Sequence, residues 1–450
     1  MHTTEGIVEF CQGLTLEDVP PEVVRQATRC TVDLLGVALA GTATRSSEIA
    51  RSYAIEHYGG GPCTLLASPV GLQVLGAAFA NSISASSLDL DDGHRAAVGH
   101  PGAVVIPAML AVAELVGASG KEFLEAVIVG YEVGIRVGAA SSQVRSRTLN
   151  GLTTGSWGAY AAAAGTAKLC RLGDSEAAHA LAIAGVHGPL APLSGCIAEG
   201  TMTKESIGWA AKTGVGAGLL AAKGMTGPLG ILDDPTMFEQ DLLVDELGKR
   251  YDILSAYVKV YPSCRWTHAA IDAVLDLIQC FQIIPEEICA IRVNTFREAA
   301  ALANYNPDSS EGIQYSIPYL VSMAALEGGV FPARIASATG SEERISEFAR
   351  RVEIVVDPDI DRLFPQQVGA AVEIFTSSDC FRQKVLRPRG DPQNPVDRSE
   401  IENRFLGFCS SFLGQPAGER LLGELDLLHR AESMVPIGRL LRGEGLASQL

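Results

Sequence analysis

Apolar residues recur at helical spacing through most of the first 260 positions of this 450-residue chain. Pro20 and Pro21 open a run whose apolar side chains share one face, and Gly41 ends it. Further runs of alanine and other small apolar residues predict buried helices over 72–87, 101–116, 120–138, 155–169, 175–186 and 207–223. Within 120–138, Gly130, Gly134 and Gly138 are four residues apart. This stripe predicts a neighbouring helix that approaches closely.

The pattern changes after Tyr261 and Pro262. A helical run over 267–281 is followed by alternating segments that predict strands at 288–295, 352–356 and 371–376, with helices at 316–326 and 341–351 between them. A run rich in proline and charge over 387–395 is typical of a linker. Helical spacing then returns over 399–412 and 418–430.

These segments predict a mainly α protein with an α+β second domain. We expect a helical domain formed by residues 1–265 and 394–450, with an α+β lid over 266–393 inserted into it. A chain of 450 residues is too long for one compact core, which supports two domains.

Composition excludes several classes of protein. A hydrophobic content of 47% with 19% charged residues describes a well-buried globular chain, and the first residues lack the order of a signal peptide. The apolar run over 103–116 is too short for a membrane span. We therefore expect a cytoplasmic protein. Its net charge of −17 disfavours nucleic acid and anionic membranes as partners, so a site for an anion must gather its own cations.

The ten cysteines are scattered and form no CxxC pair, which argues against structural zinc and disulfides, although three distant cysteines could still converge on a cluster. The glycine-rich turns follow no strand, so no dinucleotide or phosphate fingerprint is present. We predict that the protein needs no cofactor.

Ionisable residues concentrate on the loop over 88–102, between two apolar runs. Charged groups in such a place are costly unless they are paired or used. The loop could also be a solvated turn whose aspartates cap the next helix, or a metal site, although no HExxH-like spacing supports a metal. The residues concerned are Asp89, Asp91, Asp92, His94, Arg95 and His100.

Two lysines stand out because the chain contains few of them. Lys204 precedes a long apolar helix, where the helix dipole mildly disfavours a cation; it is either a solvated lysine or has a compensating role. Lys259 lies at the predicted domain boundary, where it could form an interdomain salt bridge or line a ligand cleft. Tyr315 and Tyr319 follow, and they could simply be core aromatic residues with satisfied hydroxyls.

Together these segments resemble the MmgE/PrpD family, which contains 2-methylcitrate dehydratase, cis-aconitate decarboxylase and iminodisuccinate epimerase. The resemblance spans nearly the whole chain. Its marks, in family order, are Asp89-Leu-Asp-Asp with Gly99-His-Pro-Gly, Met202-Thr-Lys with Gly208-Trp-Ala-Ala, Met225-Thr-Gly-Pro, Lys259-Val-Tyr-Pro-Ser-Cys, Tyr315-Ser-Ile-Pro-Tyr and Arg389-Gly-Asp-Pro-Gln-Asn-Pro.

The resemblance implies a homodimer whose active site lies in the cleft between a helical domain and an α+β lid, with no metal. Position by position, it places catalytic roles on Asp89, His100, Lys204, Lys259 and Tyr319. Further substrate-binding candidates are Asp92, His94, Cys264 and His268.

The chain also departs from the family pattern. Leu152 stands where decarboxylases and many relatives have a histidine. The segment after Lys204 is one residue shorter than usual and lacks its common histidine, and the spacing from Asp89 to His100 is one residue longer than in the decarboxylases. These differences weaken the transfer of decarboxylation in particular.

The resulting hypothesis is a lyase that removes a proton next to a carboxylate of a small di- or tricarboxylic acid. His100 would act as general base or acid, with Asp89 either orienting it or serving as a second proton carrier, while Lys204 and Lys259 stabilise the enolate. Tyr319 would protonate a leaving hydroxyl or orient a carboxylate. Dehydration of a 2-methylcitrate-like acid is the first expectation, with decarboxylation of a cis-aconitate-like acid, epimerisation or isomerisation as alternatives. A catalytically silent metabolite-binding protein is the alternative of another class.

Overall fold

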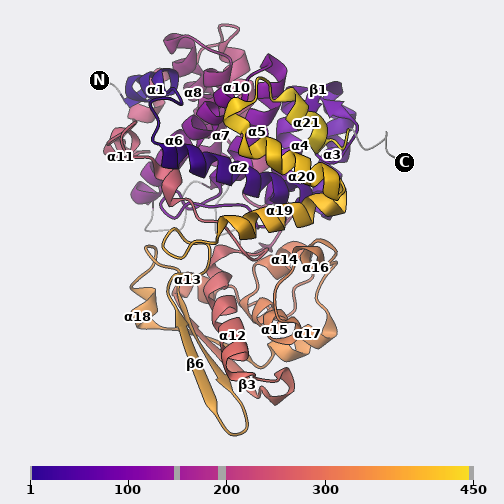
Figure 1. Cartoon of the computed structure of the whole chain (residues 1–450). Helices are drawn as coiled ribbons and strands as arrows, with labels where there is room; N and C mark the ends of the chain where they lie inside the picture. The colour runs from indigo at the N-terminus through magenta and orange to yellow at the C-terminus, as the bar shows by residue number, and fades with distance from the viewer. Residues whose placement is uncertain (1–2, 146–152, 191–198, 445–450) are drawn as a thin grey trace.

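The computed structural model describes residues 3–145, 153–190 and 199–444; Leu152 lies outside these ranges. A large helical body stands above a smaller α+β part (Figure 1). The body contains the short hairpin β1 (Gly60–Thr64) and β2 (Gly71–Leu72). Its helices before the α+β part are α1 (Thr3–Gly13), α2 (Pro21–Gly41), α3 (Arg45–Tyr58), α4 (Val74–Ser86), α5 (Pro101–Val116), α6 (Gly120–Arg145), α7 (Thr154–Leu169), α8 (Asp174–His187), α10 (Ile207–Ala221) and α11 (Gln240–Val244).

Small residues let the central helices of the body lie close together. α7 packs between α6 and α10, and all its residues from Thr154 to Ala167 are buried. A Cβ added at Gly134 of α6 would lie 2.7 Å from the Ala161 Cβ of α7, closer than packed side chains allow. The glycine stripe therefore has the packing role expected of it.

The α+β part is built around a mixed sheet with strand order β4-β3-β5-β6. β3 runs parallel to β4 and antiparallel to β5, which pairs antiparallel with β6. The strands are β3 (Ala290–Thr295), β4 (Val352–Val356), β5 (Ala370–Phe375) and β6 (Cys380–Val385). The helices of this part are α12 (His268–Phe281), α13 (Arg297–Ala300), α14 (Ser310–Gln314), α15 (Ile317–Glu327), α16 (Pro332–Ala336), α17 (Glu343–Ala349) and α18 (Pro358–Asp361).

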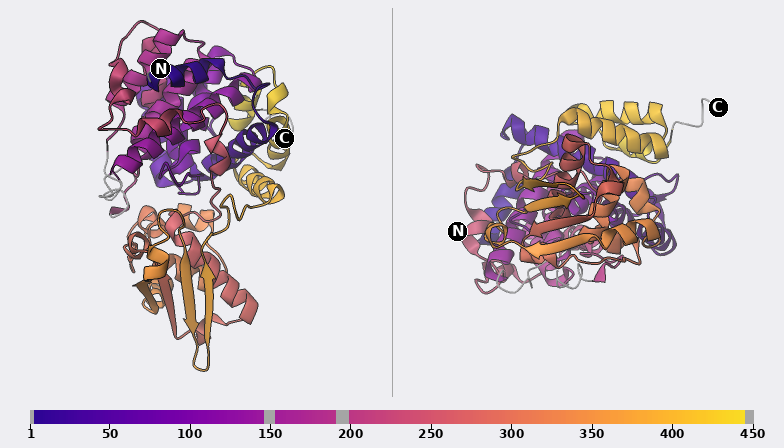
Figure 2. Two further views of the ribbon diagram at one scale, coloured as in Figure 1. Left: turned by 90° about the vertical axis from the view of Figure 1, so that its left-hand side faces the viewer. Right: turned by 90° about the horizontal axis from the view of Figure 1, so that it is seen from below.

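The chain then returns to the body through α19 (Arg398–Phe412), α20 (Gln415–Asp426) and α21 (Val435–Leu441). α19 packs on α2, and the left-hand view of Figure 2 shows the α+β part projecting from one end of the body. Side chains from 7–258 and from 396–441 share the core of the body. The fold is thus mainly α with an α+β part, as predicted from the sequence; the division into a body and a mobile lid stays a prediction.

The run over 387–395 is more than a linker. Asp391 is fully buried, and the Val258 N–H donates to the Gly390 carbonyl at 3.0 Å. Gly390 has a φ of +90°, and a Cβ added to it would lie 1.9 Å from the Val258 carbonyl oxygen. Residues 387–395 therefore form an ordered turn beside the domain boundary. Their polar groups are satisfied inside the protein: Asp391 pairs with Arg265, and the Gly390 carbonyl accepts from Val258.

Across the described ranges, no helix is long and apolar enough to cross a lipid bilayer. The described cysteines are all free; Cys11, Cys30, Cys63, Cys264 and Cys409 are buried.

Candidate active site

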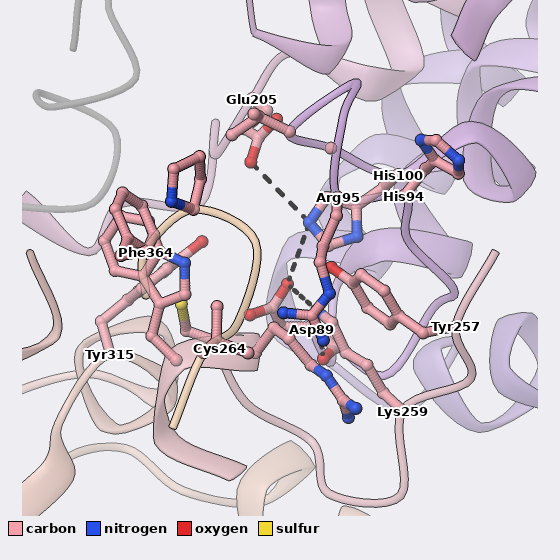
Figure 3. A pocket seen from close by; sticks show the side chains of 16 residues that line it. Asp89, His94, Arg95, His100, Glu205, Tyr257, Lys259, Cys264, Tyr315 and Phe364 are labelled. Atoms are coloured by element: carbon pink, nitrogen blue, oxygen red, sulfur yellow. Dashed lines mark hydrogen bonds and ion pairs between the residues drawn. The ribbon is translucent and has the colours of Figure 1, made fainter. Parts of the chain in front are cut away.

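A cavity of about 80 Å³ lies where the body meets the α+β part. The loop between α4 and α5 forms one wall, and the segment around Cys264 forms another (Figure 3). The titratable and charged lining residues are Asp89, His94, Arg95, His100, Glu205, Tyr257, Lys259, Cys264, Arg265 and Tyr315.

A buried ion pair forms the floor of the site. The Lys259 ammonium donates to Asp89 Oδ1 at 2.8 Å and to the Asp89 main-chain oxygen at 2.9 Å. Burial alone would raise the pKa of Asp89, but Lys259, Lys204 and His100 outweigh it and lower that pKa. Burial would likewise lower the pKa of Lys259, yet the neighbouring carboxylates raise it. Both groups are therefore charged at neutral pH. Asp89 also has a φ of +51°, which is strained for a residue with a Cβ.

The His100 ring faces the cavity with one nitrogen free to act as a base. Its Nδ1 lies 2.9 Å from the Asp92 carbonyl oxygen, which can only accept, so the proton of the neutral ring sits on Nδ1. Nε2 then carries the lone pair. It lies 3.8 Å from Asp89 Oδ1 and 3.8 Å from Glu205 Oε1 (Figure 3).

A second buried carboxylate, Asp91, lies behind the ring. Its Oδ2 is 3.4 Å from His100 Nδ1, and within the described ranges neither of its oxygens has a hydrogen-bond partner. Burial raises the pKa of Asp91. Asp89, Asp91 and His100 are close enough to share a metal ion. However, the Lys259 ammonium already occupies Asp89 Oδ1 and would repel a dication, so the donor set fits a metal poorly.

Two arginines from opposite sides of the cavity converge on one carboxylate. Arg95 pairs with Asp391 Oδ2, and Arg265 donates to Asp391 Oδ1 at 2.5 Å. The Arg265 guanidinium also lies 4.7 Å from the centre of the Tyr257 ring. Among the described atoms, Arg95 Nη1 and Arg265 Nε are buried without a partner. Unused buried donors are costly. Both arginines line the cavity, and their guanidinium groups bring positive charge to its wall.

Comparison with known proteins identifies the family. The MmgE/PrpD N-terminal domain matches residues 5–246, and the MmgE/PrpD C-terminal domain matches residues 261–427. The chain belongs to the MmgE/PrpD family. It is 24% identical to a cis-aconitate decarboxylase of Mus musculus, over 99% of this chain and 94% of that protein. Identity is 24% to the Homo sapiens cis-aconitate decarboxylase (98% and 94%) and 23% to that of Aspergillus terreus strain NIH 2624 (97% and 95%).

Lys204, to which the MmgE/PrpD resemblance gave a catalytic role, lies just behind the cavity and does not line it. Its buried ammonium donates to the Ser86 carbonyl and to Gln314 Oε1, each at 2.6 Å. It therefore connects the end of α4 to α14 across the boundary between the two parts. Burial lowers the pKa of Lys204, while Asp89 and Asp91 oppose that shift.

The structure places Tyr319 differently from the expectation for this family. Tyr319 is in the first turn of α15, outside the set of described residues that line the cavity, and its hydroxyl accepts from the Glu342 N–H at 2.9 Å. Tyr315, four residues earlier, lines the cavity instead. The reason is local: both tyrosines belong to the α+β core, but Tyr315 is the residue at which α14 ends, and Tyr319 lies beyond the turn, in the first turn of α15.

Of the four substrate-binding candidates, two line the cavity and two do not. His94 and Cys264 line the cavity. Burial lowers the pKa of His94 to about 4 and raises the pKa of Cys264 to about 12, so both are neutral at pH 7. Asp92 and His268 lie among the described residues that do not line it. Asp92 accepts from Tyr131 and from the Gly102 N–H, and His268 contacts Arg265 Nη1 at 3.1 Å.

Sequence reasoning did not assign roles to Glu205, Tyr257, Arg265 or Asp391, all of which build the site. Two of them could have been suspected because they are next in sequence to a candidate: Glu205 directly follows Lys204, and Arg265 directly follows Cys264. Asp391 gave no signal beyond the motif in which it lies.

Proposed function

We propose that this chain is a lyase that abstracts a proton next to a carboxylate of a small di- or tricarboxylic acid, without a metal or organic cofactor. The observation that carries the proposal is the 2.9 Å contact of His100 Nδ1 with the Asp92 carbonyl oxygen, which leaves Nε2 as the basic nitrogen. His100 lines a cavity together with Arg95, Arg265 and the Asp89–Lys259 pair. The relatives' names, which refer to cis-aconitate, support an acid of this class.

Each group has a role in this proposal. Arg95 and Arg265, which line the cavity, bind the substrate carboxylates. His100 Nε2 takes the proton from carbon, and the bond pair remains on the substrate as an enolate. Lys259 supplies positive charge in a buried site, where electrostatic stabilisation is strong.

We propose dehydration of a hydroxy acid as the first reaction. It requires a proton for the departing hydroxide, which then leaves as water. Burial raises the pKa of Tyr257 to about 12 and also raises the pKa of Tyr315, so both phenols are protonated at neutral pH. In this proposal one of them gives its proton to the departing hydroxide, and the proton that His100 took from carbon then restores the phenol. Decarboxylation is the second candidate, favoured by the relatives.

Proton NMR of the purified protein in D₂O, with a panel of hydroxy and unsaturated polycarboxylates, tests the proposal. Alkene formation identifies dehydration, loss of CO₂ identifies decarboxylation, and deuterium uptake without either identifies epimerisation or isomerisation. No change with any of these acids would favour a metabolite-binding protein and contradict a lyase. We also propose, from family membership, that the protein is a homodimer. Light scattering of the purified protein tests this.

A further inference from the structure

Glu205 is a cavity residue for which the sequence suggested no role. We propose that Glu205 is a positioning residue that holds His100 in place and stabilises the positive charge that its ring acquires on taking a proton. This inference rests on the proposed function only in treating His100 as the base.

The two carboxylate oxygens of Glu205 have different environments. Oε2 accepts from the Thr154 N–H at 3.0 Å and from the Thr154 hydroxyl at 2.5 Å. The same hydroxyl oxygen accepts from the His100 N–H at 3.1 Å. One threonine therefore fixes the His100 backbone and the Glu205 carboxylate relative to each other. Oε1 is left to face His100 Nε2 at 3.8 Å (Figure 3).

The backbone around Glu205 is strained in a way that fixes its direction. Lys204 and Ser206 have φ values of +41° and +60°, a region that is strained for a residue with a Cβ. A Cβ at Gly155 would lie 2.3 Å from the Glu205 carbonyl oxygen, so α7 and this loop are in close contact. Strain of this kind persists only where the surroundings impose it, and it is concentrated at functional sites.

Charge balance shows why the ring needs this carboxylate. His100 is the N-cap residue of α5, where the helix dipole disfavours a cation. Asp89 is already paired with Lys259, and burial raises the pKa of Asp91. Glu205 is a third acid facing the ring, held by neutral donors of Thr154. The other charged or titratable groups around the ring are Lys204 behind Asp89, with His94, Arg95, Arg265, Tyr257 and Tyr315 along the cavity.

The proton balance is simple. The substrate C–H proton moves to His100 Nε2, and the electron pair of that bond stays on the substrate. Glu205 Oε1, 3.8 Å from Nε2, stabilises the imidazolium until this proton replaces the one given to the departing hydroxide, which leaves as water.

The test compares Glu205→Gln with the wild-type protein. Because His100 must be unprotonated to act, and because removing the anion makes the ring less basic, we expect the acidic limb of the kcat/KM profile to move down by about 1 pH unit. We expect kcat to fall about 10-fold or more, with a smaller change in KM. NMR titration of the His100 ring should show the same downward shift, whether or not a substrate is known.

Thr154→Val is the matched control, since it removes the hydroxyl that anchors Oε2 but keeps the charge. We expect it to lower kcat while the acidic limb stays within about 0.3 pH unit of wild type. Should Glu205→Gln fail to fold, Glu205→Asp takes its place, with a smaller shift in the same direction. A folded Glu205 variant with an unshifted His100 titration would overturn the inference. Inactivity of the wild-type protein toward every acid, with the titration shift present, would instead contradict the proposed function alone.

Discussion

Lys259 and Asp89 are 170 positions apart in the sequence, yet the ammonium and the carboxylate form a 2.8 Å ion pair inside the protein. Lys259→Met leaves the buried Asp89 charge without its partner. We expect a loss of about 3–5 kcal/mol in the free energy of unfolding, measured by urea denaturation. The double variant Asp89→Asn with Lys259→Met should recover most of that stability but remain inactive. A single variant as stable as wild type would contradict this account of the pair.

His100→Gln removes the proposed base. We expect kcat to fall about 10²-fold or more with modest change in KM, because base catalysis acts on the transition state. His94→Gln is the control: it changes a histidine of the same cavity whose pKa burial lowers to about 4. Its kcat should stay within about 10-fold of wild type. Steady-state kinetics on the identified substrate would make the comparison, and near-wild-type turnover by a folded His100→Gln protein would remove the proposed proton carrier.

Tyr315→Phe and Tyr319→Phe distinguish the two tyrosines of one motif. Tyr315 lines the cavity, so loss of its hydroxyl should lower kcat by about 10-fold or more. Tyr319→Phe removes the acceptor of the Glu342 N–H and should lower stability by about 1 kcal/mol with little effect on kcat. The opposite pattern would restore the role that family resemblance gave Tyr319.

Asp92 predicts a pH dependence of stability. Burial raises its pKa from 3.8 to about 7, despite opposing hydrogen bonds from Tyr131 and Gly102. Between these values the folded chain binds more protons than the unfolded chain, so this group makes the free energy of unfolding fall as pH rises from about 4 to 7. Asp92→Asn imitates the protonated form and should flatten that part of the curve, measured by denaturation at a series of pH values. An unchanged slope would show that Asp92 titrates normally.

Exhaustive dialysis against EDTA should leave turnover unchanged. The reason is the Lys259 ammonium at Asp89, which competes with a metal for the Asp89, Asp91 and His100 cluster. Elemental analysis of the dialysed protein would accompany the assay. Activity that is lost on dialysis and restored by one metal ion would assign the cluster to that ion.

Patterns local in sequence predicted much of the fold. The expected strand over 352–356 has those bounds, and helix α12 begins one residue after the predicted start. The pattern did not reveal β6, although it alternates between exposed and half-buried positions. Its half-buried face holds Phe381 and Val385 with Gln383 between them, so the apolar stripe is too short and interrupted for the sequence to display.

The site was predictable only in part, because its contacts are long-range. Family motifs pointed to Asp89, His100 and Lys259, and the structure brings these three together. They could not distinguish Tyr315 from Tyr319, since that choice depends on how α14 turns into α15. Residue types also gave no sign that Arg95 would share Asp391 with Arg265, because these residues are up to 296 positions apart.

Arg404 of α19 pairs with Asp33 of α2 and donates to the Lys259 carbonyl at 2.6 Å. During synthesis, the first 260 residues leave the ribosome long before this arginine does. The segment that carries Lys259 therefore gains its support only when nearly nine-tenths of the chain has been made. A shorter polypeptide lacks the Arg404 contact with the Lys259 carbonyl, so the cavity takes its final form late in synthesis.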